Sequence, residues 1–118
     1  MKIKTYTTLG GKDLIIKYLN ELPRDEMLQG YAILKKLENS TTEIFGELDT
    51  RQLVGKLWEI KFYRHNRLFY VVVEQESLYI LHACKKQKGK AEKFELDKAL
   101  KRMKEITWKE EFYAISKY

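Results

Sequence analysis

The chain has 118 residues, of which 44% are hydrophobic and 34% charged, and its formal net charge is +6. A chain of this length buries about two thirds of the surface that it exposes when unfolded, so it needs no metal or disulfide to be stable. One cysteine and two histidines are too few for a disulfide framework or for a structural zinc site, which takes about four ligands. No cofactor is expected, and a reducing, cytoplasmic setting fits best.

Neither a membrane-spanning nor a secretory segment is expected. The longest apolar run, near residues 68–73, is far shorter than the ~18 residues that span a bilayer. The opening residues, MKIKT, lack the apolar core of a signal peptide. The chain is therefore expected to form one domain over residues 1–118, away from any membrane.

The first part of the chain is predicted to hold one strand and two helices. Alternation over residues 2–8 favours a strand, which two neighbouring glycines then end. Apolar residues at helical spacing predict helices over residues 12–22 and 24–38, joined as a hairpin at Pro23. Residues 39–50 are polar and are predicted to be a connection.

The pattern then changes to that of strands. Residues 57–63 and 67–74 are rich in β-branched and aromatic side chains and predict a β-hairpin around Arg64-His65-Asn66. A further strand is expected over residues 77–84, after a turn at Gln75-Glu76. The continuous apolar runs of the last two strands predict that the middle of the sheet is covered on both faces.

Helical spacing returns over residues 91–106, where a last helix is predicted. The tail over residues 107–118 either extends this helix or docks its aromatic residues, Trp108, Phe112 and Tyr113, elsewhere. The order is β-α-α-β-β-β-α, and the predicted fold class is α+β: an antiparallel sheet with an N-terminal helical hairpin and a C-terminal helix.

The positive charge is concentrated in one stretch of the chain. Residues 56–90 carry eight basic and three acidic side chains, a net charge of +5, whereas residues 1–55 sum to zero and residues 91–118 to +1. Such clustering is typical of a protein that binds a polyanion, because each neutralised phosphate releases condensed counterions. A surface that is basic only for solubility is the alternative.

The basic side chains of this stretch fall where neighbouring strands begin or end. Alternation along residues 57–63 puts Lys61 on the face opposite the apolar side chains of that strand. Because antiparallel neighbours bring their ends together, the basic segments are expected to converge at one region of the sheet. They comprise Lys61, Arg64 and His65 at the hairpin tip, Arg67 at the start of the next strand, and Lys85, Lys86, Lys88 and Lys90 after the last one.

A cationic cluster of this kind can cleave RNA. When the 2′-oxygen attacks the adjacent phosphorus, negative charge builds on the phosphoryl oxygens, and arginine or lysine side chains stabilise it. The proton transfers need only a lysine, histidine or tyrosine within hydrogen-bond reach. The sequence has no Gly-rich phosphate loop, no Gly-x-Ser-x-Gly, no Cys-x-x-Cys and no His-Glu-x-x-His, which argues against nucleotide-dependent and zinc chemistry.

Three segments, in this order, resemble a known family. They are residues 53–61 (LVGKLWEIK), 67–71 (RLFYV) and 79–88 (YILHACKKQK). They resemble the phage-derived HigB-like branch of the RelE/ParE toxin superfamily, in which a Leu-Trp-Glu-Leu-Arg strand precedes an Arg-x-x-Tyr strand, a Leu-Leu-His strand and a lysine-rich exit into the last helix. The resemblance covers the chain from about residue 4 to residue 106, and it implies a RelE-like fold.

The resemblance also implies a function and its partners. It implies the toxin of a type II toxin-antitoxin system, a metal-independent endoribonuclease that cleaves mRNA, typically in the ribosomal A site, and so inhibits translation. The implied partners are mRNA, the ribosome and a helix-turn-helix antitoxin (HigA-like). By position, Arg67 matches the arginine that contacts the scissile phosphate, Lys61 stands where the branch usually has arginine, and Lys85 or Lys86 matches the basic residue that ends the last strand.

The candidate residues follow from the charge pattern together with this resemblance. A core aromatic remains an alternative role for Tyr70, and a hydrogen-bonded core histidine remains one for His82; Cys84 is expected to be buried and inert. The expected catalytic residues are Arg67, Lys61, Lys86, Tyr70 and His82, and the expected RNA-binding residues are Arg64, His65, Lys85, Lys88 and Lys90.

Two other functions stay open at this point. The same fold also hosts ParE-like toxins that inhibit gyrase, and a non-catalytic RNA- or ribosome-binding protein would have a similar composition. The nuclease hypothesis makes one geometric demand that distinguishes it. Arg67, Lys61 and the Lys85/Lys86 pair must lie on one side of the molecule.

Overall fold

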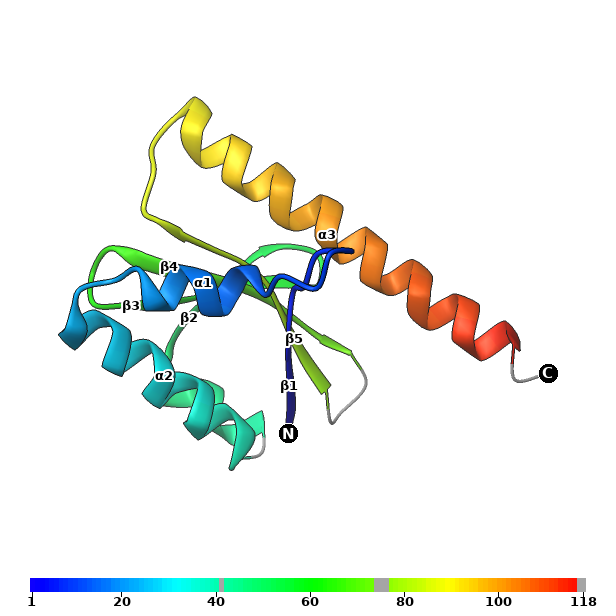
Figure 1. The fold of residues 1–118 in the computed structure, drawn as a ribbon, viewed down its shortest axis with the longest axis horizontal. Coiled ribbons are helices and arrows are strands. Elements are labelled where there is room, and N and C mark those ends of the chain that lie inside the picture. Colours follow the sequence, from blue (N-terminus) through cyan, green and yellow to red (C-terminus); the bar gives the residue numbers. More distant parts are fainter. Residues whose placement is uncertain (41, 74–76, 117–118) are drawn as a thin grey trace.

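A five-stranded sheet lies between helices on both of its faces in the computed structural model, which describes residues 1–40, 42–73 and 77–116 (Figure 1). Figure 1 shows α3 along one side of the sheet and α2 on the other. In chain order the elements are β1 (Lys2–Thr5), α1 (Leu14–Asn20), α2 (Arg24–Glu38), the short 3-10 helix η1 (Thr42–Gly46), β2 (Asp49–Val54), β3 (Leu57–Phe62), β4 (Asn66–Val73), β5 (Ser77–Lys85) and α3 (Lys90–Ser116).

The strand order is β1-β5-β4-β3-β2. The four strands from β2 to β5 are antiparallel neighbours, whereas β1 pairs in parallel with β5. The predicted α+β class is confirmed, but the sheet is mixed rather than antiparallel throughout. Parallel pairing needs a long crossover, and here the helices and β2–β4 separate β1 from β5.

One strand, β2, differs from the sequence prediction, which treated residues 39–50 as a connection and assigned no strand between residues 39 and 56. β2 is an edge strand, and most of its side chains are exposed. Polar residues suit such an edge because they hinder pairing with other chains. The strand therefore lacks the apolar alternation that reveals a half-buried strand in a sequence.

The helix starts have local causes. The Asp13 side chain accepts hydrogen bonds from the N–H groups of Ile15 and Ile16, at 3.0 Å each, and so caps α1 one residue before its start. Pro23 is the N-cap of α2, with φ −54°, whereas α1 has already ended at Asn20. The ψ of Pro23, 150°, is not yet helical, and its carbonyl accepts the first hydrogen bond of the helix, from the Met27 N–H at 2.9 Å.

Two separate cores lie on the two faces of the sheet. The α1, α2 and η1 side includes Ile60, Leu68 and Ile80 of the three central strands. The α3 side includes Phe69 and Leu81, which alternate with that first set along β4 and β5. The prediction that the apolar runs are covered on both faces is confirmed.

The last helix continues through most of the predicted tail, because α3 runs from Lys90 to Ser116. Figure 1 shows its C-terminal part extending past the sheet. The side chains of Trp108, Phe112 and Tyr113, and the turn predicted at Gln75-Glu76, lie outside what is described. Within the described ranges, none of the helices has both the length and the apolar character needed to span a bilayer.

Candidate functional site

Basic segments that are far apart in the sequence meet at one end of the sheet. Lys61 on β3 is directly opposite Arg67 on β4. The Lys86 N–H donates to the His65 carbonyl at 2.6 Å, which ties the exit of β5 to the β3–β4 connection. Figure 1 shows this connection and the segment leading into α3 at the same end of the molecule. Arg64, His65, Lys86, Lys88 and Lys90 are all exposed there.

The basic side chains of the strands do not all lie on the same face of the sheet. Lys61 and Arg67 lie on the face covered by α3, together with Glu59, whereas Lys85 lies on the α2 face. The Lys85 Nζ is 3.2 Å from the Glu26 Oε1. The demand was that Arg67, Lys61 and the Lys85/Lys86 pair lie on one side. Lys61 and Arg67 meet it, whereas strand alternation turns Lys85 away to Glu26. Lys86 follows β5 and is exposed beside the β3–β4 connection.

Glu26 is held by a second donor besides Lys85. The Asn66 amide donates to the Glu26 Oε1 at 2.9 Å and accepts from the Tyr18 hydroxyl at 2.6 Å. The hydrogen bond from Asn66, more than the nearby Lys85, lowers the pKa of the Glu26 carboxyl. This network fixes the start of α2 to the start of β4 and to the end of β5.

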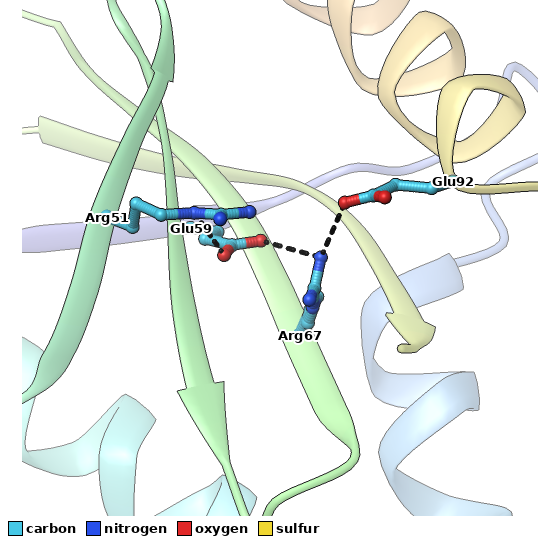
Figure 2. A network of polar contacts seen from close by, with 4 residues as sticks. All are labelled: Arg51, Glu59, Arg67 and Glu92. Atoms are coloured by element: carbon cyan, nitrogen blue, oxygen red, sulfur yellow. Dashed lines mark hydrogen bonds and ion pairs between the residues drawn. The ribbon is translucent and has the colours of Figure 1, made fainter. Parts of the chain in front are cut away.

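Arg67 lies at the centre of a row of alternating charges (Figure 2). Its Nη1 is 3.4 Å from the Glu59 Oε2 and 3.3 Å from the Glu92 Oε1, and the Arg51 Nε is 3.0 Å from the Glu59 Oε1. The exposed side-chain fractions are 7% for Arg67 and 0% for Glu59, against 47% for Glu92 and 51% for Arg51. A buried pair thus has two partly exposed outer partners.

The two carboxylates that contact Arg67, those of Glu59 and Glu92, differ in how deeply they are buried. Both oxygens of Glu59 are buried and form no hydrogen bond within the part of the chain that is described, so Arg67 and Arg51 provide the compensating charge. Glu92, in the first turn of α3, remains in contact with solvent. An incoming phosphate oxygen can replace Glu92 at the guanidinium while Glu59 continues to hold Arg67 in place.

His82 is held between two charged side chains of α3. Its Nε2 contacts the Glu95 carboxylate, and its Nδ1 lies 3.1 Å from the Arg102 Nη1. A guanidinium can only donate, so Nδ1 accepts and the neutral ring carries its proton on Nε2, facing Glu95. Burial lowers the pKa of His82, and the Glu95 carboxylate opposes this effect only in part. His82 is therefore a neutral, hydrogen-bonded imidazole.

His82, Cys84 and Glu95 are the candidate metal-binding group of the described residues. Their ligand atoms lie within 4.8 Å of one another, and these residue types bind zinc. The proton on the His82 Nε2, however, occupies the nitrogen that faces Glu95. Burial also raises the pKa of the Cys84 thiol to about 12, and cysteine binds metals as the thiolate. The arrangement favours a hydrogen-bonded cluster.

Tyr70 is not brought together with Arg67. It lies on the opposite face of the sheet and is 2% exposed, and its ring stacks on that of Phe45 with 5.4 Å between centroids. Burial raises the pKa of its hydroxyl to about 12. It lines a cavity of about 390 Å³ with Phe45, Lys56 and Trp58. Its placement fits a core aromatic better than a proton donor to a phosphodiester at Arg67.

A comparison with protein-family models identifies the family. The model described as "Phage derived protein Gp49-like (DUF891)" matches residues 17–104, from α1 into α3. The chain belongs to the Gp49-like family. This is a phage-derived family of RelE/HigB-like toxins, so the resemblance found in the sequence is confirmed at the level of the family. No curated protein matches the chain.

Sequence reasoning missed the acidic partners of this Gp49-like site. Glu92 and Glu95 are three residues apart at the start of α3, so they share a face of the helix. That face turns toward the sheet, where Glu92 meets Arg67 and Glu95 meets His82. Acidic residues on the sheet-facing side of a helix, opposite a basic strand, are the sequence signal that could have revealed these contacts.

Proposed function

We propose that the protein is the toxin of a type II toxin-antitoxin system and acts as a metal-independent endoribonuclease on mRNA, thereby inhibiting translation. Membership of a RelE/HigB-like toxin family supports the toxin class. The observation that carries the nuclease proposal is the Lys61–Arg67 cross-strand pair. Two cations on one face, beside the exposed basic tip of the sheet, suit a phosphodiester in its transition state.

Each part of the site has a role in this reaction. The RNA backbone displaces Glu92, and Arg67 and Lys61 stabilise the negative charge that develops on the phosphoryl oxygens as the 2′-oxygen attacks phosphorus. Glu59 is a positioning residue, because it holds the guanidinium from behind. The exposed imidazole of His65 and the Lys86 ammonium, at the same end of the sheet, are the candidates for proton transfer.

The charge distribution supports the partners of such a toxin. The net charge of +5 over residues 56–90 suits mRNA and ribosomal RNA, since steering by unlike charge raises the rate of encounter. A helix-turn-helix antitoxin with an acidic segment would cover the same surface. Co-purification of this chain with the product of an adjacent reading frame tests that partner.

Cleavage of mRNA by the purified chain, with and without ribosomes, tests the proposal. Wild-type protein should cleave mRNA and arrest growth when expressed. Arg67→Lys keeps the charge beside Glu59 but loses the bidentate fork, and it should slow cleavage by about 10- to 1000-fold. Arg67→Ala is a poor test, because it removes the buried partner of Glu59, leaves only the partly exposed Arg51 beside that carboxylate, and is expected to cost about 3–5 kcal/mol of stability.

Arg51→Lys is the matched control for this experiment. It makes the same change at the other partner of Glu59, where the arginine is 51% exposed and lies on the edge strand β2, and should cleave like wild type. Intact mRNA and normal growth in the presence of folded wild-type protein would contradict the nuclease proposal.

The burial of Arg67 favours a second candidate, a non-catalytic RNA- or ribosome-binding protein. In that case the exposed Arg64, His65 and Lys86 do the binding, and Arg67 is a structural residue of the buried pair. The two functions differ in how Arg67→Lys acts. A binding protein would lose affinity at most in proportion to the changed contact, whereas a nuclease loses cleavage far more than affinity.

A further inference from the structure

The connection between β3 and β4 holds two neighbouring residues in an unfavourable backbone conformation. Tyr63 has φ 47° and Arg64 has φ 62°, both in the left-handed region that glycine and asparagine adopt readily and bulky residues rarely. Two hydrogen bonds fix the connection: the His65 N–H donates to the Tyr63 carbonyl at 2.7 Å, and the Lys86 N–H to the His65 carbonyl at 2.6 Å. The backbone alone would favour Asn-Gly here.

The side chain of Tyr63 has no structural role that would explain the residue. It is 47% exposed, and it makes no hydrogen bond, ion pair or ring contact with any residue in the described ranges. Neither packing nor backbone preference accounts for tyrosine at this position. Strained and exposed positions of this kind are found at functional sites, where a ligand interaction offsets the strain.

The surroundings of Tyr63 indicate which ligand it binds. Arg64 and His65 follow it on the same turn, and Lys86 is tied to that turn through its backbone. Lys61 precedes it by two residues and is paired with Arg67. An aromatic ring among cations is the arrangement by which proteins bind single-stranded nucleic acid, because the cations hold the phosphates while the ring stacks on a base.

We propose that Tyr63 is a stacking site for a base of single-stranded RNA, on the end of the sheet that carries Lys61 and Arg67. The inference rests on the proposed function and adds to it a residue that holds the substrate. Tyr63 contributes affinity and fixes the path of the strand, whereas Arg67 acts on the phosphate. Substitution of Tyr63 should therefore act mainly on the affinity for RNA, whereas substitution of Arg67 should act mainly on the rate of cleavage.

Binding of the full chain to a fluorescently labelled 2′-O-methyl RNA 10-mer, measured by anisotropy, tests this inference. The oligonucleotide has no 2′-hydroxyl and cannot be cleaved by attack of that group. Tyr63→Asn should weaken binding by about 5- to 150-fold, the range for one stacked base. Tyr63→Phe keeps the ring and should bind like wild type. Leu28→Asn removes another exposed apolar side chain, 51% exposed on α2, and should also bind like wild type.

Two further measurements distinguish base stacking from misfolding and from attraction to phosphates alone. Asparagine suits the left-handed backbone, so Tyr63→Asn should melt at or above the wild-type temperature, which excludes misfolding as the cause of weak binding. An abasic 10-mer offers phosphates without bases, and wild type and Tyr63→Asn should bind it with equal affinity. Equal affinity of the two proteins for the base-containing 10-mer, or an equal loss on both oligonucleotides, overturns the inference.

The stacking inference and the nuclease proposal can fail separately. If Tyr63→Asn binds the base-containing 10-mer like wild type while wild-type protein cleaves mRNA and Arg67→Lys does not, the stacking inference fails and the nuclease proposal stands. If wild-type protein binds the 10-mer through Tyr63 but cleaves no mRNA, the nuclease proposal fails and base stacking stands.

Discussion

His82 is a buried base whose protonation state is set by α3 and β5. Glu95 contacts its Nε2, Arg102 donates to its Nδ1, and the nearby Lys98 also disfavours a positive charge on the ring. Burial, the largest effect, lowers the pKa of His82 below the value of about 6.5 that it has in the unfolded chain. At pH values below about 6.5, His82 therefore binds a proton more readily in the unfolded chain than in the folded protein.

Stability should therefore fall as the pH falls through 6.5. Since the unfolded state binds more protons there, the free energy of unfolding rises with pH over this window. Urea denaturation between pH 7 and pH 5, above the range in which Glu26 titrates, measures the effect. His82→Gln should remove most of the slope, and His65→Gln, at the exposed tip, should keep it. A slope that survives in His82→Gln would assign the effect to other titratable groups.

At the residue scale the sequence predicted that Lys61 and Arg67 lie close together, but not the acidic partners of Arg67. Strand alternation was enough to place Lys61 on the opposite face from Trp58, Ile60 and Phe62, and its antiparallel pairing brings it beside Arg67. Glu92 lies 25 residues from Arg67, and only the position of α3 over the sheet brings them together. The spacing of Glu92 and Glu95 shows in the sequence that they share one face of the helix, but the sequence does not place that face over Arg67, so the ion pair between Glu92 and Arg67 could not be derived from it.

Gly30 shows how the elements constrain one another. A Cβ at this position of α2 would lie 2.6 Å from the Leu19 Cδ2 of α1 and 3.3 Å from ring carbons of Phe62 on β3. Leu19 is fully buried, so a shift of its side chain would disturb the packing around it. The two helices and the sheet therefore approach as closely as they do because this residue has no side chain.

Gly30→Ala should destabilise the protein by about 1–3 kcal/mol, the usual cost of overpacking. Helix propensity acts in the opposite direction, because alanine is favoured over glycine by about 1 kcal/mol within a helix. Gly46→Ala is the control: no atom lies within 4 Å of a Cβ there, and the change should be neutral within about 0.5 kcal/mol. Urea denaturation measures both, and a stabilised Gly30→Ala would show that the helices can separate at little cost.

Glu92, in the first turn of α3, covers the Arg67 guanidinium. Among the described residues, it provides the one contact between that guanidinium and the helix. Glu92→Gln should raise RNA cleavage by about 2- to 5-fold, since the lost ion pair is partly exposed and of modest strength. Asp97→Asn removes an equal charge from an exposed position of the same helix and is the control. An equal rise in both variants, measured by initial cleavage rates, would mean that only the net charge matters.

At the element scale the helices and the β3–β4–β5 meander followed from periodicity. α1 begins two residues later than predicted, because Asp13 caps it. β2 was missed, because an exposed edge strand carries no apolar alternation. The pairing of β1 was not derivable either, since a strand pattern states which residues are extended but not which neighbour they bind.

The whole molecule carries its charge unevenly, and the salt dependence of RNA binding should show this. Each phosphate neutralised on a single strand contributes about −0.7 to the slope of log affinity against log salt concentration. Replacing Arg64 and Lys86 by glutamine should make the slope less negative by about 1.4. Replacing Lys35 and Lys36, at the far end of α2, should leave it unchanged. A uniform effect of both pairs would indicate diffuse attraction without a defined binding surface.

The parallel pairing of β1 with β5 joins segments that are made at very different times, with Lys2 opposite Ser77 and Thr5 opposite Ile80. During synthesis β1 has no partner until β5 has left the ribosome, and α3 follows later still. Contacts so distant in sequence form late and slowly. In the nascent polypeptide the first strand therefore stays unpaired until β5 is made. The face of the sheet that carries Lys61 and Arg67 is covered by α3 only at the end of folding.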